Sequence, residues 1–449
     1  MYNCGPTVYD YVHVGNLRSY VFADTLRRVL EWNDYKVKQI INITDFGHLT
    51  SDADEGEDKM TKALVREGLS FTLENTKKVA EKYTKAFLED IGELNIESAE
   101  VYPRASEHIP EQIAYIQTLL DKGYAYKTSD GIYFDVAKFP AYGILGGVAS
   151  AEHSRVGVNP EKHDSRDFSL WKNNADVGWD APWGKGFPGW HIECTAMSTK
   201  YLGKSFDIHT GGVDHIPVHH NNEIAQAEAA TGKQYVKYWL HHDFITIDAQ
   251  KVAKSVGNTI TLKQLKDRGI MPLALRYWFL TASYHQVMNF TWEAIEGAQT
   301  AYLRAMRVFV DLPAAMSSAQ AGLQGEGEPD ETYTTKFQKA INDDLNTAEA
   351  IAVLWELLKD EKIHSGVKRA TVVVFDAVLG LNFEKSGDVA SISVVSTDDI
   401  PEEVHALLEQ REAARKEKRF EDSDALRTQI HEQGFDIEDT VDGPVLRKI

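Results

Sequence analysis

The sequence predicts an α/β protein with a doubly wound parallel sheet, and three features of the chain support this fold class. A strand–helix–strand pattern begins at the first residue, and a second strand–loop–helix pattern begins near residue 206. Mixed strands and helices are predicted between them, and helices are predicted beyond about residue 300. Repeated strand–helix–strand units are typical of parallel sheets covered by helices. We therefore expect a Rossmann-like sheet with an inserted α+β segment, followed by a helical domain and a small C-terminal module.

The first strand–helix–strand unit covers residues 1–44. Met1–Cys4 predicts a short strand, and a turn-rich loop leads into a helix predicted over Asn16–Trp32. The β-branched run Lys36–Thr44 predicts the second strand. The apolar side chains of the helix recur at the spacing of one helical face, at Val21, Phe22, Leu26, Val29 and Leu30.

The inserted segment begins with a helix predicted over Ile109–Lys122, which ends at Gly123, a favourable residue after a helix. Tyr124–Tyr126 and Ile132–Val136 flank the turn sequence Ser129-Asp130-Gly131, so the two runs predict a hairpin.

The parallel pattern resumes at the strand Phe206–Ile208, which passes through Gly211-Gly212 into a helix that ends near Gly232. In the helical region, Asn346 and Glu349 have the spacing of a capping box. Segments 312–332 and 384–400 are rich in Ser, Gly, Pro and Asp and are expected to be linkers or loops.

Length and composition indicate an ordinary globular protein with several domains. The chain has 449 residues, of which 43% are hydrophobic and 26% charged, and no window has the roughly 18 uninterrupted apolar residues of a membrane span. Two cysteines cannot form a disulfide framework, and no signal peptide is visible, so we expect a cytoplasmic protein. The net charge of −20 argues against a nucleic-acid partner, although phosphate binding needs only a local basic face.

The two cysteines lie where a parallel sheet binds ligands. Cys4 ends the first predicted strand, and Cys194 lies at the start of a predicted helix. His219 and Glu223 are four residues apart on another predicted helix, so both project from one face. Two thiolates, an imidazole and a carboxylate form an acceptable zinc site. Without a CxxC motif, spacing alone favours buried cysteines and a solvated His–Glu pair.

Two loops have residues suited to phosphate. Cys4-Gly5-Pro6-Thr7 leaves the first strand, and His13-Val14-Gly15-Asn16 opens the first helix, whose N-terminus would attract anions. Residues of these types also begin helices for capping reasons, so both interpretations stay open. Farther on, Lys251 and Lys254 precede Gly257-Asn258 and could clamp a polyphosphate, but surface lysine pairs are more often solvated charges.

The C-terminal segment carries a candidate RNA-binding face. Its basic residues are Arg411, Arg415, Lys416, Lys418 and Arg419, with Arg447-Lys448 near the end of the chain. Apolar side chains are expected to pack on the opposite side, namely Leu407, Leu408, Phe420, Leu426 and Ile430. Acidic residues are interleaved, so a salt-bridged helix is an equally good interpretation.

Together and in this order, the motifs resemble one family across nearly the whole chain. The motifs are CGPTVYDYVHVGN, NITD, GWHIECTAMSTKYLG, HHNNEIAQAEAATG, KVAKSVGN, INDDLNTAEAIAVLWEL and a DALR-like C-terminal segment. In this combination the chain resembles the cysteinyl-tRNA synthetases of class I. The resemblance implies that cysteine is activated with ATP to cysteinyl-adenylate and transferred to the 3′-terminal adenosine of tRNA for cysteine.

The resemblance also implies roles for individual residues. One zinc ion per chain is expected to bind to Cys4, Cys194, His219 and Glu223. ATP, with Mg²⁺, is expected to contact His13, Gly15, Asn16, Asp214 and Lys254. His13, Asn16, Lys251 and Lys254 are the expected catalytic residues, and Thr44, Trp190 and His209 the expected substrate-binding residues. Zinc would select the cysteine thiol over the serine hydroxyl, which a shaped apolar pocket discriminates only about 10- to 200-fold.

The chain departs from the family's pattern at several places. Ala253 replaces the serine of the lysine-rich clamp motif, and Thr210 stands where a three-glycine run is expected. The stretch after NITD is longer than usual, which puts any role of His48 in doubt.

The resemblance gives a domain plan and a partner list. We expect a monomer that binds tRNA, cysteine and ATP and no membrane. A cysteine ligase of the mycothiol pathway and a non-catalytic RNA- or zinc-binding paralogue are the alternatives. The expected domains are a catalytic domain in two halves (1–102 and 179–236), an inserted connective segment (103–178), a clamp-loop segment (237–299), a helical tRNA-binding domain (300–385) and an anticodon-binding module (390–449).

Overall fold

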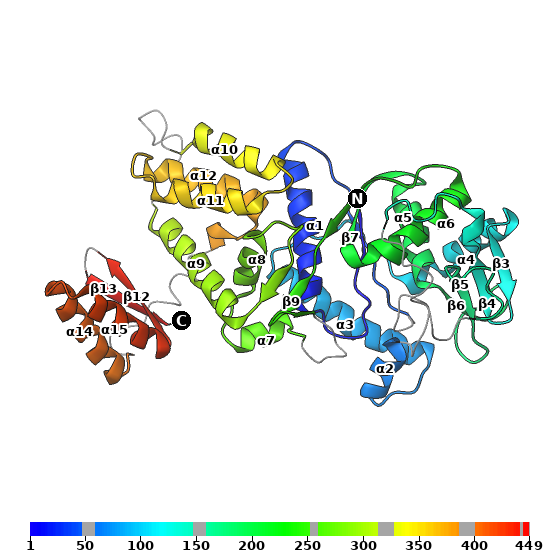
Figure 1. The fold of residues 1–449 in the computed structure, drawn as a ribbon, viewed down its shortest axis with the longest axis horizontal. Helices are drawn as coiled ribbons and strands as arrows, with labels where there is room; N and C mark the ends of the chain where they lie inside the picture. The colour runs from blue at the N-terminus through cyan, green and yellow to red at the C-terminus, as the bar shows by residue number, and fades with distance from the viewer. Residues whose placement is uncertain are drawn as a thin grey trace. The chain divides into compact units, whose positions relative to one another are not determined.

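The computed structural model describes residues 1–46, 59–146, 159–251, 259–312, 327–385, 400–440 and 443–448, and Figure 1 shows their helices and strands. The chain divides into two compact units. The first contains residues 1–262 and 283–290, and the second contains residues 263–282 and 291–449. In the described part of the chain, no helix is long and apolar enough to cross a membrane.

Among the described residues, a four-stranded parallel sheet with the order β2-β1-β7-β8 forms the centre of the first unit. Its strands are β1 (Tyr2–Asn3), β2 (Ile40–Ile41), β7 (Phe206–Gly212) and β8 (Val236–His242). The helix α1 (Val14–Trp32) joins β1 to β2. The predicted doubly wound parallel sheet is therefore confirmed.

The second strand is shorter than its β-branched sequence predicts. Only Ile40–Ile41 forms a ladder, although Lys36–Thr44 was expected to be extended throughout. The backbone of the following residues bonds to other segments, because Ile43 N–H donates to the Pro103 carbonyl and Thr44 N–H donates to the Pro6 carbonyl. The β1–α1 loop and residues 101–104 thus take the place of a longer strand partner.

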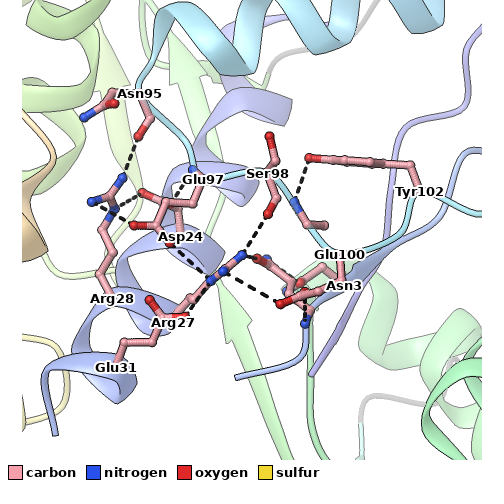
Figure 2. Close-up of polar contacts among 12 residues, drawn as sticks. Asn3, Asp24, Arg27, Arg28, Glu31, Asn95, Glu97, Ser98, Glu100 and Tyr102 are labelled. Atoms are coloured by element: carbon pink, nitrogen blue, oxygen red, sulfur yellow. Dashed lines mark hydrogen bonds and ion pairs between the residues drawn. The ribbon is translucent and has the colours of Figure 1, made fainter. Parts of the chain in front are cut away.

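A polar network fixes α1 against residues 95–102, as Figure 2 shows. Arg28 forms a buried ion pair with Asp24, 2.8 Å between Nε and Oδ2, and donates to the Asn95 carbonyl. Arg27 pairs with Glu31 and donates to the Ser98 carbonyl. Since these residues lie in the second half of α1, the network sets the direction in which the helix N-terminus points.

Two helices follow β2 and brace the loop before α1. They are α2 (Lys59–Arg66) and α3 (Leu73–Glu93). The guanidinium of Arg66 donates to the Asp10 carboxylate at 3.0 Å and to the Tyr9 carbonyl at 2.8 Å. The hydroxyl of Tyr83, on α3, accepts from the same guanidinium.

The inserted segment has its own antiparallel sheet of order β3-β4-β5-β6 in the described residues. After η1 (Ala105–His108) come α4 (Ile109–Asp121), β3 (Ala125–Thr128), β4 (Gly131–Phe134), η2 (Val136–Lys138), β5 (Phe168–Asn173) and β6 (Gly186–Pro188). The predicted helix and hairpin are both present. The sheet extends to Pro188, past residue 178 where the sequence placed the end of the segment.

The second half of the parallel sheet brings four helical segments to its edge. In chain order the elements are α5 (Trp190–Leu202), β7, η4 (Val213–His215), η5 (Ile216–His220), α6 (Asn221–Thr231) and β8. The helix α6 ends at Gly232, whose φ of 68° is the left-handed conformation that glycine favours after a helix. A small sheet of order β10-β9-β11 follows: β9 (Ile245–Ile247), β10 (Gln250–Lys251) and β11 (Met288–Phe290).

The second unit is mainly helical. Its elements are α7 (Leu262–Asp267), α8 (Pro272–Leu280), α9 (Trp292–Asp311), α10 (Glu331–Asn342), α11 (Thr347–Lys359), α12 (Ser365–Leu379), η7 (Phe383–Lys385), α14 (Glu402–Lys416), α15 (Phe420–Glu432), β12 (Phe435–Thr440) and β13 (Gly443–Lys448). The side chain of Asn346 accepts from the Glu349 N–H at 3.1 Å and caps α11, but the Asn346 N–H donates to the carbonyls of Ala340 and Asp343. Only one half of the predicted capping box therefore forms.

One prediction for the C-terminal module, residues 400–448, is wrong. Its basic stretch is divided into α14 and α15 by Lys418, which has a φ of 60°. Phe420, predicted to be packed, is 65% exposed, because it starts the second helix outside the apolar cluster. Ile430 is buried in that cluster, and Leu407 and Leu408 pack against it.

Candidate active site

A cavity of about 400 Å³ lies in the first unit, at the carboxyl ends of β1 and β7 and the N-terminus of α1. This is the edge at which parallel α/β sheets bind ligands. The β1–α1 loop approaches β2 closely, because a Cβ on Gly5 would lie 1.5 Å from the Asn42 carbonyl oxygen. Only glycine fits there, and the loop can therefore pass from the strand end into the cavity wall.

Cys4, Cys194, His219 and Glu223 converge at this cavity. Their ligand atoms all lie within 4.8 Å of one another, although the residues come from the end of β1, from α5, from η5 and from α6. Cys4, Cys194 and His219 line the cavity, whereas Glu223 lies behind them and is fully buried. A ligand in the cavity can therefore reach the cluster.

The charges of the cluster are mutually dependent. Hydrogen bonding with the Cys194 thiol holds the pKa of Cys4 well below its usual value, and the same contact together with burial raises the pKa of Cys194. Burial would raise the pKa of Glu223, but the neighbouring His209 and His219 lower it to about 2. The site therefore holds Glu223 as a carboxylate and favours a thiolate at Cys4.

Two buried atoms of the cluster are placed to bind a cation and do not form a hydrogen bond with each other. His219 Nε2 and Glu223 Oε1 are 3.0 Å apart, yet neither has a hydrogen-bond partner among the described residues. A buried polar atom without a partner is unfavourable unless an ion or water satisfies it. Two sulfurs, one imidazole nitrogen and one carboxylate oxygen match the ligands that zinc takes in a tetrahedral site.

The remaining atoms of these ligands are held by a second layer of side chains. His191 Nδ1 lies 2.8 Å from His219 Nδ1, so the other ring nitrogen of His219 faces the cluster. Glu223 Oε2 accepts from the Tyr235 hydroxyl at 3.1 Å and lies 3.2 Å from His209 Nε2. Such outer contacts orient metal ligands. Sequence reasoning missed His191 and Tyr235, which are ordinary buried residues by their spacing.

A second set of four groups also converges nearby. Cys4, His209, His220 and Glu223 offer ligand atoms within 4.8 Å of one another. Among the described residues, however, His209 and His220 do not line the cavity, whereas Cys194 and His219 do. The first set is therefore the better candidate for an ion that meets a substrate.

Of the three residues expected to bind the amino acid, one lines the cavity and two lie behind its lining. Trp190 lines the cavity, and its ring stacks on that of His219 with 4.2 Å between centroids. Thr44 is buried and donates to the Glu193 carboxylate at 3.0 Å. Within the described residues, neither Thr44 nor His209 is part of the cavity lining, so the structure keeps both one layer away.

The residues expected to bind ATP gather at the start of α1 and the end of β7. His13, Gly15, Asn16 and Asp214 all line the cavity. His13 and Asn16 also form a capping box, since each side chain accepts from the backbone N–H of the other. Capping and ligand contact thus involve the same residues. Lys254 and the side chain of Lys251 lie outside the described residues.

In the C-terminal module, two of the predicted basic residues are paired with acidic neighbours. The Arg419 guanidinium contacts Glu417 at 2.8 Å and Asp422 at 2.5 Å, and all three side chains are largely exposed. Arg411 is buried and pairs with Glu412 at 3.0 Å. These contacts are those expected if the stretch forms salt-bridged helices.

The family comparisons agree with this fold and site. Residues 1–300 match the model of the tRNA synthetases class I (C) catalytic domain, residues 336–384 match the DALR domain, and residues 397–443 match the cysteinyl-tRNA ligase anticodon binding domain. Among solved structures, a methionyl-tRNA synthetase from Mycobacterium tuberculosis in complex with methionyl-adenylate aligns with a TM-score of 0.56. The alignment covers 88% of this chain and 94% of the methionyl-tRNA synthetase chain at 15% sequence identity, which shows a shared fold. The catalytic domain is that of a class I tRNA synthetase.

Relatives by sequence define the group more narrowly. A protein named Cysteine--tRNA ligase 1 from Burkholderia lata is 46% identical over 99% of this chain and 91% of its own length. The Cysteine--tRNA ligase of Thermus thermophilus is 41% identical over 99% of this chain and 94% of its own length. The chain belongs to the cysteinyl-tRNA synthetase family.

Proposed function

We propose that this chain joins cysteine to its tRNA in two steps, using ATP. Cysteine is first activated to cysteinyl-adenylate with release of pyrophosphate, and the cysteinyl group then passes to the 3′-terminal adenosine of tRNA for cysteine. The observation that carries the proposal is the convergence of Cys4, Cys194, His219 and Glu223 at a cavity that also reaches the N-terminus of α1.

The cluster end of the cavity would recognise the amino acid. One zinc ion bound by Cys4, Cys194, His219 and Glu223 would supply a soft cation that prefers a thiolate to a hydroxyl group. Trp190 stacks on His219 and so presents an apolar wall beside the cluster. His191, His209 and Tyr235 hold the ligand side chains in place from behind.

The helix end of the cavity would receive the nucleotide. The N-terminus of α1 carries the partial positive charge of the helix dipole, and His13, Gly15 and Asn16 line the cavity there. The phosphates of ATP, with Mg²⁺ as part of this substrate, would lie there. Asp214 would accept from the ribose, and Lys254 would stabilise the charge that develops on the α-phosphate and the departing pyrophosphate. The protein mainly positions the carboxylate of cysteine for in-line attack.

The C-terminal residues would bind the tRNA. The match of residues 397–443 to an anticodon binding domain supports this role and favours the tRNA ligase over a cysteine ligase of the mycothiol pathway. We propose that one chain is sufficient for the reaction and that it works in the cytoplasm. The family matches also support a catalytic region that ends near residue 300, with tRNA-binding modules after it.

The experiment that tests this proposal is cysteine-dependent exchange of pyrophosphate into ATP, measured for the wild type and for Lys254→Ala. The wild type is expected to show exchange that requires cysteine. The variant is expected to be slower by roughly 10²–10³-fold, which is the loss expected when one charge contact of the transition state disappears. A wild type without any cysteine-dependent exchange would instead indicate a non-catalytic RNA- or zinc-binding protein.

A further inference from the structure

Ser19 and His242 face the nucleotide end of the cavity, and neither was singled out from the sequence. Ser19 lies on α1 beyond Gly15 and Asn16, and His242 is the last residue of β8. Both line the cavity, where Ser19 is half-buried and His242 is only 5% exposed. A Cβ on Gly212 would lie 2.2 Å from the Asp214 carboxylate and 3.7 Å from the His242 ring, so these residues share one corner.

The contacts of His242 determine where its proton lies. Its Nδ1 is 2.9 Å from the carbonyl oxygen of Asp243, and because a carbonyl can only accept, Nδ1 must carry a proton. Burial lowers the pKa of His242 to about 4, so the ring is neutral near neutral pH. Its Nε2 therefore has no proton and can only accept.

This tautomer fixes the hydroxyl of Ser19. Ser19 Oγ lies 2.6 Å from His242 Nε2, so the hydroxyl must donate its hydrogen to the ring. Phe22, one turn farther along α1, packs against the imidazole with 5.8 Å between ring centroids and limits its rotation. With its hydrogen engaged, the Ser19 hydroxyl offers only lone pairs to the cavity.

Ser19 adds an acceptor to the part of the cavity lining that also contains the Asp214 carboxylate, and two acceptors select a ligand group that donates hydrogen bonds. The nucleoside part of ATP has such groups, namely the ribose hydroxyls and the amino group of adenine. Phosphate oxygens, which only accept, are excluded from this corner. We propose that Ser19 accepts a hydrogen bond from the nucleoside of ATP and that His242 is the positioning residue that sets Ser19 as an acceptor. This inference rests on the proposed function of the cavity.

The test is pyrophosphate exchange with the full-length protein, using ATP, 2′-deoxy-ATP, 3′-deoxy-ATP and ITP, in which oxygen replaces the adenine amino group. Ser19→Ala is expected to raise the KM for ATP roughly 3- to 10-fold, the value of one neutral hydrogen bond, with a smaller change in kcat. For the wild type, the analogue that lacks the donor should have a higher KM than ATP. For Ser19→Ala, the KM of that analogue should be no higher than the KM of ATP. Ser19→Thr, which keeps the hydroxyl, should restore the preference.

Two further variants isolate the positioning role. Thr25→Val removes a hydroxyl from the same helix, where Thr25 bonds to the Val21 carbonyl, and is expected to leave the KM for every nucleotide unchanged. His242→Asn should raise the KM for ATP about as much as Ser19→Ala, and the double variant should be no worse than either, because both remove one interaction. Melting temperatures show whether each variant is folded.

The outcomes separate this inference from the proposed function. Suppose that the wild type shows cysteine-dependent exchange, but that each analogue raises the KM relative to ATP by the same factor in Ser19→Ala as in the wild type. The role proposed for Ser19 is then wrong, and the proposed function stands. Additive effects of Ser19→Ala and His242→Asn would contradict the positioning role of His242. A wild type without exchange would overturn both.

Discussion

In the cavity, polar side chains from distant parts of the chain are buried together, whereas in the C-terminal module charged side chains pair mainly with near neighbours. Cys4 and Cys194 are separated by most of the catalytic domain, and Glu223 is fully buried with them. Arg419, in contrast, pairs at the surface with Glu417 and Asp422. Burial of ionisable groups costs free energy, so a buried cluster of such groups indicates a functional site. Exposed neighbouring pairs carry little information about function.

The largest effect that this comparison predicts is the loss of a cluster ligand. Cys194→Ala should abolish stoichiometric zinc binding and lower cysteine-dependent exchange at least about 100-fold, since a direct ligand matters at least as much as its outer contacts. Zinc content by elemental analysis and exchange rates check this. Met197→Leu, a volume-conserving change at a buried position of the same helix, is the control and should retain both. Full zinc content in Cys194→Ala would remove that residue from the ligand set.

The next effect separates the two regions by activity. Deletion of residues 390–449 should leave cysteine-dependent pyrophosphate exchange nearly unchanged, because the cavity lies in residues 1–262. Charging of tRNA should fall by roughly 10²-fold, as expected when a set of phosphate contacts is lost. Aminoacylation with labelled cysteine measures the second quantity. An equal loss in both assays would show that the module supports the catalytic region itself, and no loss in either would favour a cysteine ligase of the mycothiol pathway.

A smaller effect concerns the outer layer of the cluster. Tyr235→Phe removes one donor to Glu223 and should weaken zinc binding about 10- to 100-fold, because outer contacts tune ligand orientation. Competition with a chromophoric chelator gives the zinc affinity directly. Tyr133→Phe, at a buried tyrosine of the inserted segment, is the control. Unchanged zinc affinity in Tyr235→Phe would mean that Glu223 is held sufficiently by His209 or is not a ligand.

The smallest effect is expected at the surface of the C-terminal module. Arg419→Gln should leave the melting temperature within experimental error, because exposed ion pairs contribute little to stability. Arg411→Gln is the matched comparison: this arginine is buried, so the variant should lower the melting temperature measurably. Thermal unfolding of both variants checks the contrast. Equal shifts would contradict the distinction between exposed and buried charges.

The sequence predicts elements whose pattern is local. The capped start of α11 at Asn346 and the end of α6 at Gly232 follow from residue types at fixed spacing. The extent of β2 does not, because residues beyond Ile41 bond to the β1–α1 loop and to Pro103, which depends on tertiary contacts. Phe420 was misplaced for a related reason, since the break at Lys418 changes which face the second helix presents.

The candidate site shows the same division. Cys4, Cys194, His219 and Glu223 were named because their residue types and family motifs indicate a metal, and the structure brings them together. Among the outer residues, the sequence predicts a substrate-binding role for His209 but no role for His191. Tyr235 gives no signal by spacing. His242 and Ser19 are 223 positions apart, and only the geometry of their hydrogen bond shows that the serine is an acceptor.

The central claim is that the four-residue cluster holds a zinc ion that selects the substrate thiol. Its most direct test is the zinc content of the purified protein, measured together with cysteine- and serine-dependent pyrophosphate exchange before and after treatment with a chelator. We expect about one zinc per chain, and a loss of cysteine activation and of discrimination against serine when it is removed. A metal-free protein that activates cysteine and still rejects serine would contradict the claim.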